Sequence, residues 1–113
     1  MKRTFLYTAS LSIAACLLAT GALAQSKLDE KSAQALLQKS GCIACHTVDK
    51  KIIGPAYKDV AAKYRTVKGA DKTLIAKVRE GGKGAWGEIP MSPNPTVPEA
   101  DVRALVQWIL TLK

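Results

Sequence analysis

Residues 41–47 read GCIACHT, in which Cys42 and Cys45 stand three positions apart and His46 follows directly. Residues at i, i+3 and i+4 of a helical turn share one face, so two thiols and an imidazole would point the same way. In an exported protein, C-x-x-C-H is typical of covalent haem attachment. Cys42 and Cys45 would form thioethers to the two vinyl groups, and a nitrogen of His46 would bind the iron.

Three other interpretations of the cysteine pair explain less. A structural zinc site needs about four ligands, commonly cysteine and histidine, and without Cys16 the chain offers only Cys42, Cys45 and His46. A thioredoxin-like redox motif is expected beside a βαβ pattern, and no convincing strand pattern is present. A plain disulfide would close a very short loop, gain little entropy and leave His46 without a role. We therefore predict one haem c, covalently attached through Cys42 and Cys45.

The first 24 residues have the pattern of a cleaved secretory signal peptide. A basic start precedes an uncharged apolar run over residues 5–23, and Ala22-Leu23-Ala24 matches the small-x-small cleavage pattern. We expect Sec-type export to the periplasm and a mature domain of residues 25–113. Two alternatives stay open: an uncleaved membrane anchor, since the run is about long enough to span a bilayer, and lipidation at Cys16.

The mature chain would form one small basic domain. A domain of this size buries a modest fraction of its surface and often needs a staple, which covalent haem would supply. The formal net charge of the whole chain is +8, and loss of Lys2 and Arg3 with the signal peptide leaves an excess of six positive charges. This excess favours an acidic partner or surface, although solubility alone would also explain it.

The hydrophobic pattern predicts an all-α domain. Apolar side chains recur at helical spacing over residues 29–39, 56–64 and 71–80, and again in a final helix. In that last helix, Thr96-Val97-Pro98-Glu99 is interpreted as a capping box, and an apolar stripe follows at Val102, Leu105, Ile109 and Leu112. The segment GGKGAWGEIPMSPNP at 81–95 is expected to form a long loop without regular structure, because it is rich in glycine and proline.

This long loop contains the candidate for the sixth ligand of the iron. His46 is the only histidine of the chain, and Met1 would leave with the signal peptide, which isolates Met91 between Pro90 and Pro93. A lone methionine often serves packing, but a thioether braced by prolines fits an axial haem ligand. We predict that His46 and Met91 bind the metal and that the haem fills the centre of the domain.

These motifs resemble the class I cytochromes c, in particular the small bacterial monohaem c-551/c-552 (c8) type. The resemblance covers essentially the whole mature chain and rests on GCIACH at 41–46, IGPAYKDVAAKY at 53–64, GKGAWGEIPMSPN at 82–94 and VQWIL at 106–110. It implies the class I cytochrome c fold, in which about four short helices wrap around one covalently bound haem c.

The resemblance also implies roles for residues around the haem. The Pro55 carbonyl would accept a hydrogen bond from His46 and so fix its tautomer. Trp86 would direct its indole N–H at a haem propionate. Lys77 stands where many relatives carry an arginine near a propionate, so a forked contact would become a single-point one.

Two further positions concern the methionine loop. The resemblance implies that Asn94 bonds near the Met91 sulfur and orients its lone pair. Many relatives read Pro-Met-Pro-Pro, whereas here Ser92 replaces the first proline after the methionine, a change expected to loosen the loop.

Iron bound by both His46 and Met91 has no position open to a substrate, so we expect an electron-transfer protein and no enzyme. Methionine ligation disfavours the ferric form and raises the potential. The expected partners are redox proteins of a respiratory chain with acidic docking surfaces, met by a ring of basic residues at the exposed haem edge. The mature chain is expected to be a monomer that binds no nucleic acid and has no permanent membrane anchor. The candidate docking residues are Lys39, Lys50, Lys51, Lys58 and Lys63.

Two other functions remain possible at this point. A haem enzyme or gas sensor would need Met91 to leave the iron free, and a fixed subunit of a larger redox complex would need a permanent partner. A basic face that serves only solubility would equally explain each single lysine.

Overall fold

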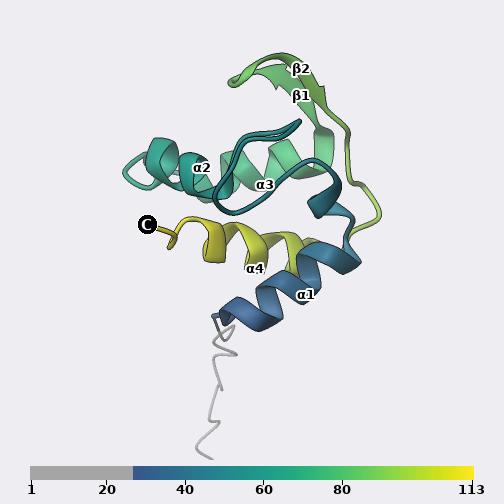
Figure 1. Cartoon of the computed structure of the whole chain (residues 1–113), viewed down its shortest axis with the longest axis vertical. Coiled ribbons are helices and arrows are strands. Elements are labelled where there is room, and N and C mark those ends of the chain that lie inside the picture. The colour runs from purple at the N-terminus through teal and green to yellow at the C-terminus, as the bar shows by residue number, and fades with distance from the viewer. Residues whose placement is uncertain (1–26) are drawn as a thin grey trace, which may run out of the picture.

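The computed structural model describes residues 27–113. Within this range the chain forms four α-helices, one turn of 3₁₀-helix and a two-stranded hairpin (Figure 1). The predicted all-α fold of about four short helices is confirmed, with a small hairpin added to it. The predicted cleavage after Ala24 and the lipidation alternative at Cys16 lie outside the described residues. No helix between residues 27 and 113 is long and apolar enough to cross a membrane.

The first helix, α1 (Glu30–Lys39), delivers the chain to the cysteine motif. Its N-cap Asp29 accepts a hydrogen bond of 2.7 Å from the backbone N–H of Ser32. This bond satisfies one of the donors that a helix start leaves free and lowers the pKa of Asp29 below its ordinary value. Ala33 and Leu37 form the buried side of the helix.

Two short helices follow the cysteine motif. The helix α2 (Tyr57–Tyr64) begins after Pro55 and Ala56, and α3 (Ala70–Glu80) ends at Gly81. Both ranges agree closely with those predicted from the hydrophobic spacing. The apolar side of α3 is only half-buried in the protein itself, since Leu74 and Val78 border a cavity.

The last helix, α4 (Glu99–Ile109), begins later than the capping-box prediction required. Pro98 is the N-cap, with extended backbone and no side-chain cap, so the prediction that Thr96 caps this helix is wrong. A residue that precedes proline is disfavoured from helical conformation, which keeps Val97 out of the helix. The carbonyl of Pro98 accepts the first helical hydrogen bond, from Val102 at 3.1 Å.

The segment expected to be an irregular loop contains a hairpin. Strand β1 (Gly82–Gly84) pairs antiparallel with β2 (Gly87–Met91), placing Gly82 opposite Met91 and Gly84 opposite Gly87. Every residue of the two strands except Met91 is exposed. A strand without a buried face has no alternation of apolar and polar side chains, which is why the hydrophobic pattern did not predict it.

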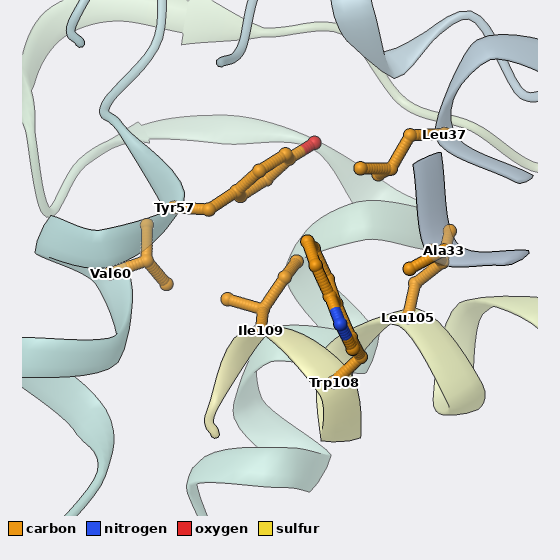
Figure 2. Close-up of a cluster of buried hydrophobic side chains, with 7 residues drawn as sticks. All are labelled: Ala33, Leu37, Tyr57, Val60, Leu105, Trp108 and Ile109. Atoms are coloured by element: carbon orange, nitrogen blue, oxygen red, sulfur yellow. The ribbon is translucent and has the colours of Figure 1, made fainter. Parts of the chain in front are cut away.

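The core forms around α4, on which α1, α2 and α3 all pack. Figure 1 shows α4 between α1 and the pair α2 and α3, with the hairpin beyond α3. Side chains from three helices point toward one another in the main cluster (Figure 2): Ala33, Leu37, Tyr57, Val60, Leu105, Trp108 and Ile109. Of the predicted stripe on α4, Val102, Leu105 and Ile109 are buried, and Leu112 packs on the cluster's edge.

Candidate functional site

All eight residues predicted to surround a cofactor border a single cavity of about 310 Å³. This volume lies within the usual range of roughly 300–1,000 Å³ for small-molecule and cofactor pockets. The walls come from the cysteine motif, the start of α2, one side of α3, the hairpin and α4. The eight predicted residues are Cys42, Cys45, His46, Pro55, Lys77, Trp86, Met91 and Asn94.

One tight turn holds both thiols beside the cavity. This turn contains the 3₁₀-helix η1 (Cys42–Ala44). The carbonyl oxygen of Cys42 accepts hydrogen bonds from two backbone N–H groups, that of Cys45 at 3.2 Å and that of His46 at 3.0 Å. Cys42 and Cys45 are half-buried free thiols, and burial raises the pKa of the Cys42 thiol above its ordinary value. Among residues 27–113 no three or more His, Cys, Asp or Glu side chains are arranged so that they could hold a metal ion by themselves.

The ring of His46 is fixed from several directions. Its Nδ1 lies 2.8 Å from the carbonyl oxygen of Pro55. A carbonyl oxygen only accepts, so Nδ1 donates the hydrogen bond, and in the neutral tautomer that makes this bond Nε2 carries the lone pair. The ring stacks on Tyr57 with centroids 5.0 Å apart and an interplanar angle of 18°. The backbone of Gly54 leaves no room for a side chain, since an added Cβ would lie 2.5 Å from Cε1 of His46.

Tyr57 and Gly54 were not singled out from the sequence, although both determine the surroundings of His46. Tyr57 is also a member of the main cluster, and burial raises its pKa well above its usual value, so its hydroxyl stays neutral. Both residues lie inside the segment IGPAYKDVAAKY, and that segment was the available signal. Hydrophobic spacing alone does not distinguish a tyrosine that packs in a core from one that also supports an imidazole.

Met91 ends strand β2 and is half-buried beside the cavity. The residues after it turn back toward α3, where the backbone N–H of Asn94 donates to the Val78 carbonyl at 3.0 Å. The side-chain nitrogen of Asn94 donates to the carbonyls of Ser92 at 3.0 Å and Val78 at 3.4 Å. The amide group of Asn94 is therefore engaged with backbone, and its nitrogen braces the turn that follows Met91.

Trp86 lies at the turn between the two strands and is 41% exposed. The ammonium nitrogen of Lys63 lies 4.5 Å from the centroid of its ring and donates a hydrogen bond of 2.7 Å to the carbonyl of Ala85. Lys77 reaches the base of the hairpin, since its Nζ lies 3.3 Å from where a Cβ of Gly82 would stand. The hairpin is thus held at its tip by α2 and approached at its base by α3.

The five lysines proposed to ring the cofactor edge have different surroundings. Lys51 borders the cavity. Lys58 pairs with Asp49 at 2.5 Å, and Lys63 is engaged with the hairpin. Lys39 and Lys50 are exposed but do not border the cavity. A lysine that the sequence did not single out, Lys83, does border it and pairs with Glu88 at 2.9 Å.

The residues around the cavity fit a haem c. Two free thiols and an imidazole with an available Nε2 stand on one turn, as covalent attachment and iron ligation require. Ile53 and Ile89 border the cavity yet remain 54% and 64% exposed in the protein itself, so an apolar macrocycle would cover apolar surface. The half-buried side of α3 would be completed in the same way.

Known proteins resemble this chain over most of its length. A family model described as cytochrome c matches residues 31–113. A cytochrome c-551 of Allochromatium vinosum is 61% identical over 77 residues, which cover 68% of this chain and 82% of that relative. A cytochrome c-551 of Pseudomonas aeruginosa is 42% identical over 97 residues, covering 86% of this chain and 92% of that protein.

A solved structure agrees with the fold. The crystal structure of wild-type Nitrosomonas europaea cytochrome c552 superposes with a TM-score of 0.69 and 51% sequence identity. The match covers 71% of this chain and 99% of that one.

Proposed function

The chain belongs to the cytochrome c family, and from this premise we propose that it is a periplasmic carrier of single electrons whose haem iron is bound by His46 and Met91. Family membership makes it a small c-type cytochrome with covalently bound haem c that transfers electrons and is no enzyme. The bound haem supplies one-electron Fe(III)/Fe(II) chemistry. The chain's own residues would attach the haem and orient its ligands.

The observation that carries the proposal is the shared position of His46 and Met91 on one apolar cavity. The bond from Nδ1 of His46 to Pro55 fixes the tautomer, leaves Nε2 for iron and makes the imidazole a stronger donor. The thioether of Met91, the second ligand in this proposal, favours the ferrous state. Together the two side chains would leave no coordination position for a substrate.

The resemblance to class I cytochromes c implies roles for the neighbouring residues, and their places on the cavity wall support these roles. Trp86 would donate its indole N–H to a haem propionate, and the ammonium group of Lys77 would make a single contact near a propionate. The resemblance implies that Asn94 bonds near the Met91 sulfur, but its side-chain nitrogen donates to the carbonyls of Ser92 and Val78, so it would act on the sulfur by bracing the turn after Met91.

A spectrum of the oxidised protein tests the ligation. Iron bound by methionine sulfur gives a weak sulfur-to-iron charge-transfer band at the red end of the visible range, and we expect this band in the wild type. Met91→Ala should abolish it and let the reduced protein bind CO. Ile89→Ala, a change of similar size in the same strand, should retain the band and exclude CO. A wild type without the band that already binds CO would instead favour a haem enzyme or gas sensor.

Export is proposed on the pattern of residues 1–24 together with the haem-attachment motif. The mature protein should begin at Gln25, and one domain of residues 25–113 should carry one haem. Intact-mass analysis of protein isolated from the periplasm tests both points. A mass that retains the first 24 residues, or one that carries a lipid on Cys16, would contradict the proposal.

Redox proteins are the partners of this cytochrome, and we propose that they present acidic surfaces to its basic face. The exposed lysines near the cavity, Lys51 and Lys83, are placed to contribute. Electron-transfer rates should then fall as salt rises, since the Debye length shrinks from about 10 Å at 0.1 M to about 3 Å at 1 M. Rates that stay constant over this range would favour docking through the exposed apolar residues Ile53 and Ile89.

A further inference from the structure

The segment between β2 and α4 is bound to the C-terminal end of α3 by hydrogen bonds that cross from one element to the other. The guanidinium of Arg79 donates from Nη1 to the carbonyl of Val97 at 2.9 Å and from Nη2 to the carbonyl of Pro95 at 3.4 Å. The carbonyl of Val78 accepts from the backbone N–H of Asn94 at 3.0 Å. The last carbonyls of a helix have no partner within the helix, so this contact satisfies one of them.

The same end of α3 also touches the backbone beside Met91. A Cβ added to Gly81 would lie 2.4 Å from the carbonyl oxygen of Met91 and 2.8 Å from the nitrogen of Pro93. Gly81 has φ 69° and ψ −154°, a region that is essentially restricted to glycine. The backbone of residues 91–93 therefore lies directly against the backbone of Gly81, where α3 ends.

Apart from the side-chain bonds of Asn94 and the pairing of Met91 with Gly82, little else holds this segment in place. Ser92, Pro93, Pro95 and Thr96 are all exposed, so burial of apolar surface contributes little to its position. Arg79, by contrast, is partly buried and spans two carbonyls with one planar group. A guanidinium is preorganised for two parallel contacts of this kind, whereas an ammonium makes a single-point contact.

We propose that Val78, Arg79 and Gly81 form a clamp that keeps Met91 on the cavity, and that Arg79 is a positioning residue for the sixth ligand. The inference rests on the proposed ligation of iron by Met91. Without the clamp the segment moves away from α3 more often, and the thioether leaves the iron more often. An added ligand that competes with the thioether then binds more tightly, because its apparent affinity rises with the fraction of protein in which the position is free.

Binding of imidazole to the oxidised protein measures this fraction. Arg79→Met keeps an unbranched apolar stem but removes both hydrogen bonds, and it should tighten imidazole binding by about tenfold, the size expected for lost bonds from a charged donor. Arg79→Lys retains the charge with one point of contact, and its imidazole affinity should lie between those of the wild type and of Arg79→Met. Arg103→Met is the matched control, because Arg103 makes only an exposed ion pair with Glu99 on α4, and it should bind imidazole as the wild type does.

Hydrogen exchange provides a readout that does not depend on ligand competition. The amide of Asn94 donates to Val78, so Arg79→Met should increase its exchange rate while Arg103→Met leaves the rate unchanged. Gly81→Ala should have the same effect on Asn94 and on imidazole binding. Gly69→Ala changes a glycine at the other end of α3, also at positive φ, where an added Cβ meets nothing within 4 Å, and it should have neither effect.

The outcomes separate the clamp from the proposed ligation. A wild type that has the charge-transfer band, together with an Arg79→Met variant of unchanged imidazole affinity and unchanged Asn94 exchange, would overturn the clamp alone. A wild type without the band would overturn the ligation by Met91 and with it the positioning role of Arg79. Tighter imidazole binding in Arg79→Met, partly restored in Arg79→Lys and absent in Arg103→Met, is the result that the clamp predicts.

Discussion

The imidazole of His46 is enclosed by buried and backbone groups, whereas the segment that ends in Met91 is exposed along almost its whole length. His46 stacks on Tyr57, a residue of the main cluster, and is touched by the backbone of Gly54. Before Met91, the hairpin buries no face, and it is fastened mainly by Lys63 and by the end of α3. One proposed ligand thus packs against the core through Tyr57, and the other is carried by an exposed segment that hydrogen bonds fasten to α2 and α3.

This difference has a consequence for stability. Displacing His46 would require the surroundings of Tyr57 and η1 to open, which disturbs packing that involves α1, α2 and α4. Displacing Met91 would require only the local release of an exposed segment, and regions with few buried apolar contacts open at low free energy. We expect ligand exchange at the iron to occur on the methionine side and the histidine side to change only when the domain unfolds.

Removal of a cysteine should have the largest effect, because loss of the covalent attachment would affect the surroundings of both His46 and Met91. Cys42→Ala and Cys45→Ala should leave little protein with bound haem, since the apo chain has a cavity where the half-buried face of α3 needs a partner. The haem absorbance per mole of purified chain measures the loss. Ser32→Ala, a surface change on α1, should leave the haem content at the wild-type level. Cysteine variants that retain full haem content would contradict the assignment of covalent attachment.

A smaller but specific effect is expected on the histidine side. In Gly54→Ala the new Cβ would stand 2.5 Å from Cε1 of His46. Such overpacking should lower the free energy of unfolding by about 2 kcal/mol. Chemical denaturation of the haem protein measures it. Gly69→Ala introduces a Cβ that meets nothing within 4 Å and should cost about 1 kcal/mol through its backbone alone. Equal losses in the two variants would mean that His46 is not confined by Gly54.

The smallest effect is expected at the tip of the hairpin. Lys63→Met removes the bond to Ala85 and the contact with the Trp86 ring, and it should lower the free energy of opening the hairpin by about 1 kcal/mol. Hydrogen exchange of the β1 and β2 amides measures this, while the exchange near His46 should not change. Lys58→Met, which loses only an exposed pair with Asp49, should leave the hairpin amides unchanged. Equal exchange in both variants would show that Lys63 does not fasten the hairpin.

Much of the histidine side could be predicted from the sequence. Local rules cover it well. An acidic N-cap and a basic last turn mark α1, and proline and glycine mark the ends of helices. The motif C-x-x-C-H is by itself typical of haem attachment. The stripe on α4 also predicted which side of that helix is buried. These features depend on residues close together in the chain, and such residues follow spacing rules.

The methionine side was predicted less completely, for physical reasons. The hairpin has no buried face, so its strands left no alternating pattern. The start of α4 depends on the restriction that Pro98 places on Val97, which outweighed the capping-box pattern. The contacts of Arg79 and Lys63 join residues 16 to 22 positions apart. No local spacing indicates such pairs, so from the sequence these two basic residues could be interpreted only as positive charges.

The reduction potential of Met91→His tests the central claim most directly. Imidazole stabilises the ferric state more than a thioether does, so the variant should keep a six-coordinate, low-spin haem and a clearly lower potential than the wild type. Each drop of about 59 mV is a tenfold change in a one-electron equilibrium, a difference that voltammetry resolves easily. Ile89→His, which adds the same imidazole two residues earlier, should leave the potential close to that of the wild type. A potential of Met91→His that equals the wild-type value would mean that Met91 does not bind the iron.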